Sequence, residues 1–225
     1  MIVLIITVLA CSAYARNLVW RNDVALWTDV VRKSPRQQRG YVNLCVQYAV
    51  AKNNEQALLV CGKAIAIKPV QTNNLLANAY VNRGAVYSDL GREKEAREDY
   101  LAALAVSPNN WWLHNNLGNA YAREGQFDTA LSHYAHAISL NPSYASAYYN
   151  RGVVANYLND RAQAIDDFTR ALDLDPRNAD ALLKRGSVYA AMGRRDDALV
   201  DFQRACAQGS PGGCEAAQRL REHRK

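Results

Sequence analysis

Glycines recur at an interval of 34 residues along much of this 225-residue chain, at Gly84, Gly118, Gly152 and Gly186. Self-similarity at a fixed interval of roughly 20 to 50 residues is typical of arrays of one repeated unit, each burying its apolar face only against its neighbours. The interval therefore predicts a stacked array of units rather than one central core.

Several other positions keep the same interval. An alanine follows each glycine after twelve residues, an aromatic residue after sixteen and a second alanine after nineteen. In the four registers these are Ala96, Tyr100 and Ala103; Ala130, Tyr134 and Ala137; Ala164, Phe168 and Ala171; and Ala198, Phe202 and Ala205. Small residues allow two antiparallel helices to approach closely, and an aromatic ring fills the space that they leave. A proline near the end of each register, the last one shifted by one residue, stops the second helix.

This pattern resembles the tetratricopeptide repeat (TPR) family from about residue 38 to the end of the chain. The resemblance implies an all-α fold, a right-handed TPR superhelical solenoid of helical hairpins. Full repeats are expected at 38–71, 77–110, 111–144, 145–178 and 179–212. A degenerate half-repeat helix is expected at 18–37 and a polar capping helix at 213–225, because the ends of a solenoid need a polar cover.

The first full repeat departs from the pattern. Cys45 stands at the glycine position and Cys61 at the aromatic position. The segment Thr72–Leu76 is a five-residue insertion before the next repeat. We expect the insertion to lengthen a loop or a helix end.

Composition supports this interpretation and excludes other classes. Hydrophobic residues make up 49% of the chain, with only 12 Gly and 6 Pro, which favours helices over disorder or many short strands. The mean hydropathy of −0.30 is too polar for a polytopic membrane protein. A formal charge of +6 is modest and spread along the chain, so no nucleic-acid partner is expected.

The N-terminal segment is predicted to contact the membrane. Residues 2–9 are apolar apart from Thr7, and the apolar character fades before Arg16. Residues 1–17 are therefore expected to be a membrane anchor or signal segment, with cleavage, lipidation at Cys11 or retention as a membrane span all left open. The alternative is a buried first helix of the half-repeat.

Residues 1–45 resemble a specific junction. An apolar helix followed by Arg16, Trp20, Trp27, Pro35 and Asn43 is similar to the junction in the transmembrane-and-TPR O-mannosyltransferase family, where the last membrane helix leads into a TPR tail. The family's membrane transferase portion has no counterpart in this sequence, so the resemblance transfers no catalytic residue. It implies the recognition part of such a system without the enzyme.

The cysteines bear on the compartment. Cys45 and Cys61 occupy positions that face each other in a TPR hairpin, and the spacing of Cys206 and Cys214 resembles a disulfide of Sel1-like repeat proteins. Two disulfides favour an oxidising compartment, with the protein anchored to the inner membrane and the TPR domain in the periplasm. The basic residues that follow the apolar segment favour the cytoplasm instead. Cysteines that serve only as small buried apolar residues are a further alternative.

No catalytic or cofactor motif is found in the sequence. There is no phosphate-binding glycine loop and no nucleophile signature, so we expect no enzyme activity and no cofactor. His133 and His136 lie three residues apart on a predicted helix but lack a further ligand at motif spacing. We interpret both as surface residues and expect no metal site.

The candidate site is the concave surface formed by the first helices. One repeat position, two residues before the glycine or cysteine, carries Asn43, Asn82, Asn116 and Asn150. Side-chain amides both donate and accept hydrogen bonds, so a row of them can pair with the backbone of an extended peptide. TPR superhelices of glycosyltransferases use a similar asparagine row, although Asn-Leu-Gly and Asn-Arg-Gly are also common TPR sequences. The same surface is expected to hold Trp112, Asn115, Asn119, Tyr149 and Asn156.

The sequence therefore predicts a membrane-associated TPR scaffold that binds a peptide segment or a partner subunit. One alternative is the substrate-recruiting portion of a membrane glycosyltransferase system. Another is a structural subunit of a larger membrane protein complex, docked through its outer face.

Overall fold

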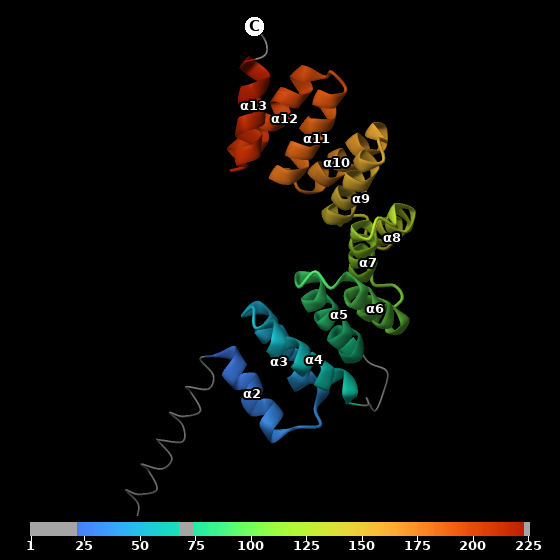
Figure 1. The fold of residues 1–225 in the computed structure, drawn as a ribbon, viewed down its shortest axis with the longest axis vertical. Helices are drawn as coiled ribbons and strands as arrows, with labels where there is room; N and C mark the ends of the chain where they lie inside the picture. Colours follow the sequence, from blue (N-terminus) through green and yellow to red (C-terminus); the bar gives the residue numbers. More distant parts are fainter. Residues whose placement is uncertain (1–21, 68–73, 223–225) are drawn as a thin grey trace, which may run out of the picture. The chain divides into compact units, whose positions relative to one another are not determined.

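The computed structural model describes residues 22–67 and 74–222, and every regular element in them is a helix (Figure 1). The all-α class predicted from the repeat is confirmed. The predicted membrane or signal segment, residues 1–17, lies outside the described residues. Within the described ranges, no helix is long and apolar enough to cross a membrane.

Twelve helices occupy the described residues. They are α2 (Asp23–Lys33), α3 (Gln38–Val50), α4 (Asn54–Ala66), α5 (Asn74–Asp89), α6 (Glu93–Val106), α7 (Trp111–Arg123), α8 (Phe127–Leu140), α9 (Ala145–Tyr157), α10 (Arg161–Leu174), α11 (Ala179–Ala191), α12 (Arg195–Ala207) and α13 (Pro211–Glu222). The chain divides into two compact units, Met1–Pro108 with α2 to α6 and Asn109–Lys225 with α7 to α13.

Glycine and an aromatic ring set the distance between the two helices of a hairpin. A Cβ atom added to Gly118 would stand 2.5 Å from Cε1 of Tyr134, and one added to Gly84 would stand 2.8 Å from Cε1 of Tyr100. All eight of the periodic alanines on the second helices are fully buried. These contacts explain why the sequence requires small residues at these positions.

The turn inside each hairpin needs a left-handed residue at one repeat position. Gly125 has φ 76° there, and Asn159 takes the same place in the following repeat with φ 64°. Glycine and asparagine tolerate this conformation better than other residues. The chain can therefore reverse direction after a first helix within a few residues.

In the N-terminal unit, α2 packs against the first hairpin. Trp27 and Val31 of α2 pack against a buried cluster that includes Leu44 and Val60. Helix α5 has 16 residues, whereas the other four first helices have 13. Its start at Asn74 shows that part of the inserted segment Thr72–Leu76 lengthens this helix.

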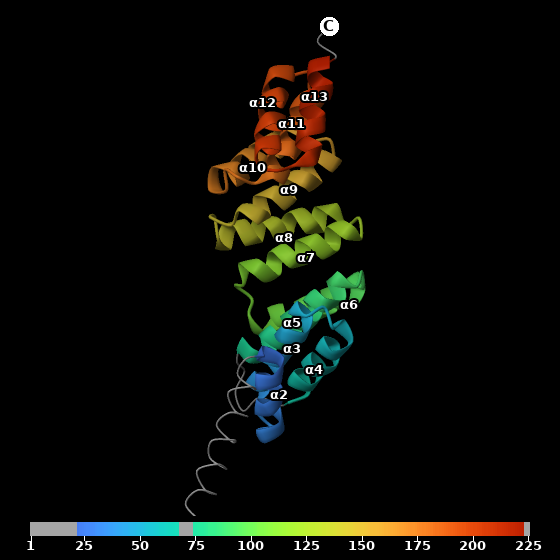
Figure 2. The ribbon, with the colours of Figure 1, turned by 90° about the vertical axis from the view of Figure 1, so that its left-hand side faces the viewer.

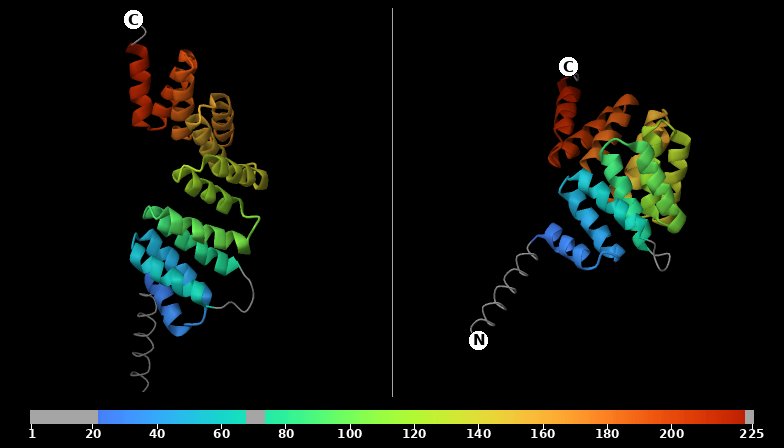
Figure 3. Two further views of the ribbon diagram at one scale, coloured as in Figure 1. Left: turned by 45° about the vertical axis from the view of Figure 1, so that its right-hand side comes forward. Right: turned by 60° about the horizontal axis from the view of Figure 1, so that its bottom comes forward.

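In the C-terminal unit, α7 to α12 form three hairpins and α13 packs against α12 (Figures 2 and 3). Helix α13 starts at Pro211, two residues earlier than expected for the cap. Its first turn is capped by Ser210, whose Oγ accepts a hydrogen bond from the Gly213 amide at 3.2 Å. Proline suits this first helical position because its missing N–H has no partner there.

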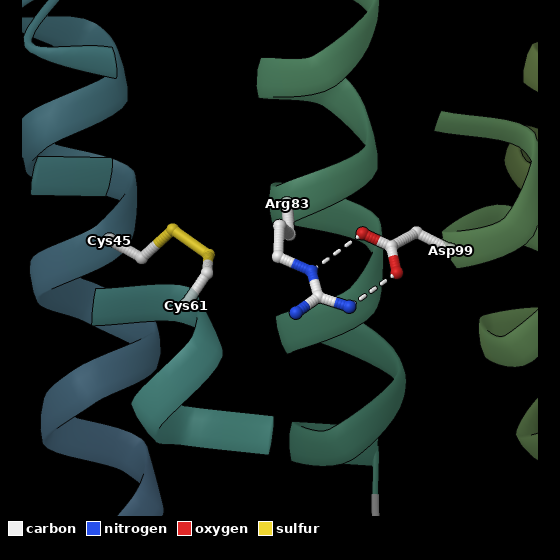
Figure 4. Close-up of a disulfide and its surroundings, with 4 residues drawn as sticks. All are labelled: Cys45, Cys61, Arg83 and Asp99. Carbon is white, nitrogen blue, oxygen red and sulfur yellow. Dashed lines mark hydrogen bonds and ion pairs between the residues drawn. A yellow bond between two sulfur atoms is a disulfide. The ribbon is translucent and has the colours of Figure 1, made fainter. Parts of the chain in front are cut away.

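Both expected disulfides are present. Cys45 and Cys61 are joined between α3 and α4 and are fully buried, at the positions that glycine and an aromatic residue take in the other repeats (Figure 4). Cys206 and Cys214 join the end of α12 to the start of α13, where Cys214 is exposed. The first bond thus joins the two helices of the first hairpin, and the second joins the last hairpin to the cap helix α13.

A buried ion pair recurs between the helices of three hairpins, and the sequence analysis missed it. Arg83 donates to both carboxylate oxygens of Asp99 at 2.7 and 2.8 Å (Figure 4). The equivalent pairs are Arg151–Asp167 and Arg185–Asp201. The hydrogen bond to Asp99 raises the pKa of Arg83. The signal was readable in the sequence, because these arginines directly precede the periodic glycine and each aspartate follows 16 residues later.

Candidate functional site

The candidate residues of the C-terminal unit lie on two neighbouring first helices. Trp112, Asn116 and Asn119 follow one another at helical spacing on α7, and Asn150 belongs to α9. Residues three or four apart share one face of a helix, so the α7 residues form a stripe that ends at Arg123. All four side chains are partly exposed.

Asn115 does not face solvent, contrary to the prediction. The residue is only 3% exposed, and its Oδ1 accepts a hydrogen bond from Nδ2 of Asn150 at 3.0 Å. This bond ties α7 to α9 and fixes the amide of Asn150. Asn115 is therefore a positioning residue, because a buried amide needs a partner from inside the protein.

Asn116 carries a buried donor that has no partner in the described part of the chain. Its Nδ2 atom is buried and has no hydrogen-bond partner among the described residues. Leaving a buried donor unpaired costs about 1–3 kcal/mol. A native structure retains such a group where a ligand or ordered water completes it.

Asn119 is held by the aromatic ring of its own repeat. The hydroxyl of Tyr134 donates a hydrogen bond to Oδ1 of Asn119 at 2.8 Å. Burial raises the pKa of Tyr134, so the hydroxyl keeps its proton and remains a donor. The bond leaves the Asn119 amide with a fixed orientation.

An open pocket of about 440 Å³ lies between the end of α7, the start of α8 and the second half of α9. Arg123 of α7 and Val153 and Tyr157 of α9 line it together with Phe127. Tyr157 is 69% exposed, and its ring centroid lies 4.6 Å from that of Phe127. We call Trp112, Asn116, Asn119, Asn150 and the pocket the α7–α9 surface.

The sequence analysis did not find this pocket. Val153 and Tyr157 follow Asn150 at helical spacing, which is a readable signal, but the contribution of Phe127 depends on how the hairpin folds. Asn156, also predicted for the site, is exposed on α9 next to Tyr157.

Tyr149 is mainly a packing residue. Its ring contacts Phe168 with a centroid distance of 5.9 Å and joins two apolar clusters of the same unit. Burial raises its pKa. The prediction that it anchors a ligand receives no support from these contacts.

The remaining two asparagines belong to the N-terminal unit. Asn43 lies on α3 and Asn82 on α5, and both are partly exposed. The row predicted from the sequence thus divides into a pair in each unit, and the pocket is lined in part by α7 and α9, the helices that carry Asn116 and Asn150.

The two histidines considered in the sequence differ in burial. His136 is exposed as expected, whereas His133 is partly buried and contacts His114. In residues 22–67 and 74–222, no group of three or more His, Cys, Asp or Glu side chains is arranged to hold a metal ion.

Family models match most of the repeat region. A model described as TPR repeat matches residues 84–125 and 118–155, and two models described as tetratricopeptide repeat match 145–178 and 180–208. The chain belongs to the tetratricopeptide repeat family. As a TPR protein, it shares a fold made of two-helix repeats stacked on their neighbours.

One curated relative of this TPR protein is an enzyme of much greater length. Protein O-mannosyl-transferase Tmtc3 of Drosophila melanogaster is 30% identical over 99 residues, which are 44% of this chain and 10% of that protein. The chain therefore spans about a tenth of the length of this relative.

Solved structures show the same fold at low identity. The TPR protein YrrB, described as having an unusual peptide-binding site, is 24% identical, with a TM-score of 0.65 over 85% of this chain and 97% of YrrB. PilF of Pseudomonas aeruginosa is 23% identical, with a TM-score of 0.73 over 82% of this chain and 83% of PilF. These likenesses concern the fold alone.

Proposed function

We propose that this TPR protein is a membrane-associated scaffold that binds an extended protein segment across the α7–α9 surface. The observation that carries the proposal is the buried Nδ2 of Asn116, which has no partner among the described residues although it lies in a row of side-chain amides. A turn of the partly exposed Asn116 side chain would present this donor to a backbone carbonyl of a bound segment.

The chemistry of the surface suits a peptide whose backbone is recognised along with one side chain. Asn116 offers a donor, and Asn150 is held in place by Asn115 at 3.0 Å. An amide offers both donor and acceptor, so it pairs with a peptide unit of any sequence. The pocket between Arg123, Val153 and Tyr157 is mainly apolar and suits one large apolar side chain of the segment.

The absence of catalytic chemistry is part of this proposal. The candidate side chains are amides and aromatic rings, which bind but do not transfer protons or act as nucleophiles near neutral pH. We therefore propose a binding role without enzyme activity.

A second candidate is the recruitment of substrate to a membrane glycosyltransferase. The 99-residue match to Protein O-mannosyl-transferase Tmtc3 supports it, together with the resemblance of residues 1–45 to a junction between membrane helix and TPR tail. In this role the α7–α9 surface would hold the acceptor polypeptide, and the transferase would be a separate chain.

We further propose that the TPR domain faces an oxidising compartment, the periplasm, and is anchored to the inner membrane by residues 1–17. The buried disulfide Cys45–Cys61 and the exposed disulfide Cys206–Cys214 support this placement. Thiol labelling of denatured protein from its own membrane should modify at most Cys11. Modification of all five cysteines would place the domain in the cytoplasm.

The binding proposal is tested by capturing partners from detergent-solubilised membranes with the full chain. Asn116→Ala should reduce capture severalfold, and Trp112→Ala should reduce it further if the ring is an anchor, because buried aromatic anchors are often worth about 2 kcal/mol or more. Gln163→Ala on α10 is the matched control, since this exposed polar side chain lies on a second helix. Equal capture by Asn116→Ala and the control would contradict the proposal.

A further inference from the structure

The repeat 111–144 differs from three others at positions that meet in space. Where those repeats carry the arginine–aspartate pair, this repeat carries Leu117 and His133. Three residues before the arginine, two of the other repeats carry Tyr80 and Tyr148, and here His114 stands instead. The charged contact between the two helices is thus replaced by a contact between histidines.

The histidines contact one another across the hairpin. Nδ1 of His114 on α7 lies 3.1 Å from Nδ1 of His133 on α8. The ring of His136 stacks on the ring of His114 with a centroid distance of 5.3 Å. The ring of Tyr121 stacks on that of His133, also with a centroid distance of 5.3 Å. We call His114, His133 and His136 the histidine cluster.

The close contact between nitrogens depends on protonation. At hydrogen-bond distance one Nδ1 must donate and the other must accept, so the pair holds together only while one of these nitrogens lacks a proton. If both rings are fully protonated, two donors and two positive charges face each other. His136 donates from Nδ1 to the carbonyl of Ser132 at 2.9 Å, so its proton-accepting nitrogen is Nε2, and protonation there adds a third charge beside His114.

The surroundings oppose charge on this cluster. Burial, and after it the charges of His114 and His136, together lower the pKa of His133 from 6.5 to about 4. His114 and Tyr121 face this ring from α7, and His136 lies beside it on α8. Among the described residues, α9 also packs against α8 but adds no charge to the causes of this shift.

We propose that the histidine cluster is an acid-sensitive contact that holds α7 against α8 at neutral pH and releases it when the cluster is protonated. Three of the other hairpins keep an arginine–aspartate pair at this place, and the hydrogen bond to the aspartate raises the pKa of each arginine. Acid should therefore loosen one hairpin of the C-terminal unit and spare its neighbours.

The release would also affect the α7–α9 surface, a consequence that rests on the proposed function. Helix α7 carries Trp112, Asn116 and Asn119, and Tyr134 of α8 holds the Asn119 side chain at 2.8 Å. Separation of α7 from α8 would break this bond and disturb the amide row. A ligand bound there would be released in acid.

The direction of the pH effect follows from proton linkage. Because the pKa of His133 in the folded hairpin is lower than its ordinary value of 6.5, the open hairpin binds the proton more tightly. The contact is fully present above about pH 6.5 and is lost progressively as the pH falls toward about 4. Since the ring is only half-buried, we expect an effect of roughly tenfold on the opening equilibrium between about pH 7.5 and pH 5.2, less than the full shift implies.

Hydrogen exchange of the full chain, corrected for the intrinsic effect of pH, tests the proposal without any ligand. Amide protection in α7 and α8 should fall roughly tenfold between about pH 7.5 and pH 5.2 relative to α11 and α12, which carry Arg185–Asp201. Equal changes in both hairpins would overturn the proposal. Because no partner is needed, this result is independent of whether the α7–α9 surface binds a peptide.

A matched variant restores the arrangement of the other repeats. The triple substitution His114→Tyr, Leu117→Arg and His133→Asp should remove the extra loss of protection in α7 and α8, and an unchanged loss would contradict the proposal. If this variant does not fold, the imidazole titrations of the unmodified protein decide by nuclear magnetic resonance. His133 should titrate well below its ordinary pKa of 6.5, and titration of His133 near 6.5 would overturn the proposal.

Discussion

The repeats 38–71 and 111–144 both lack the arginine–aspartate pair of the other hairpins, and they replace it differently. In the first, Leu44 and Val60 stand at the two positions, and the adjacent disulfide Cys45–Cys61 joins the helices. In the other, His133 contacts His114 across the hairpin at 3.1 Å. One hairpin is thus held by a covalent bond that is insensitive to protonation, and the other by a contact that depends on it.

The comparison shows which part of a TPR hairpin is fixed and which part can vary. The buried alanines Ala57, Ala64, Ala130 and Ala137 are kept in both repeats and set the distance between the helices. The contact beside them varies among an ion pair, a disulfide and a histidine pair. Differences in stability and in response to conditions should therefore come from the variable contact.

The largest expected effect is the loss of the first disulfide. Replacing Cys45 and Cys61 by alanine should lower the free energy of unfolding of the N-terminal unit by about 3 kcal/mol, because the bond closes a loop between residues 16 apart. Urea denaturation followed by circular dichroism measures the change. The matched variant Cys45→Gly with Cys61→Tyr recreates the pair of the other repeats and should recover part of the loss. Equal stability of all three proteins would show that the bond contributes nothing.

Breaking an arginine–aspartate pair should have the next largest effect. Asp167→Ala leaves Arg151 partly buried without its carboxylate, and we expect a loss of about 2–3 kcal/mol in the C-terminal unit, below the fully buried case because Arg151 reaches water. Asp166→Ala, an exposed neighbour on α10, is the control and should cost under about 0.5 kcal/mol. Urea denaturation measures both variants. Similar denaturation midpoints would mean that apolar contacts can replace the pair, as Leu44 and Val60 do in the first repeat.

A larger side chain at one of the buried alanines tests the packing that repeats 38–71 and 111–144 share. Ala130 of α8 is fully buried in a cluster with Tyr121 and Ala122 of α7, so Ala130→Leu should cost about 1–3 kcal/mol. Ala135→Leu on the same helix adds the same side chain at an exposed position and should leave the melting temperature nearly unchanged. If Ala130→Leu melts like the unmodified protein, the alanines do not set the helix separation.

Much of the fold was predictable because it follows from a period. The interval of 34 residues places Gly118 against Tyr134 and Cys45 against Cys61, and the structure has both contacts. The ion pairs obey the same interval and could have been found. The contact between Asn115 and Asn150 could not, because repeat position alone does not say which amide turns inward. The pocket was missed for a similar reason, since Phe127 reaches it only through the turn of its hairpin.

The smallest expected loss of stability distinguishes Asn116 from Asn150, which occupy the same repeat position. Asn150→Ala leaves the buried Oδ1 of Asn115 without its partner and should cost about 1–2 kcal/mol. Asn116→Ala removes a buried donor that has no partner and should cost under about 0.5 kcal/mol. Thermal melting of the two variants compares them directly. Equal losses would indicate that the bond between the two helices is not formed in solution.

Site-specific photo-crosslinking in the native membrane tests the binding claim most directly. A photoreactive residue in place of Tyr157, at the pocket, should crosslink to a partner polypeptide, and Asn116→Ala in the same chain should reduce the yield severalfold. The same residue in place of Val200, which is 55% exposed on α12, should not crosslink to that partner. Crosslinking from position 200 and none from position 157 would contradict the account and indicate a subunit docked through its outer face.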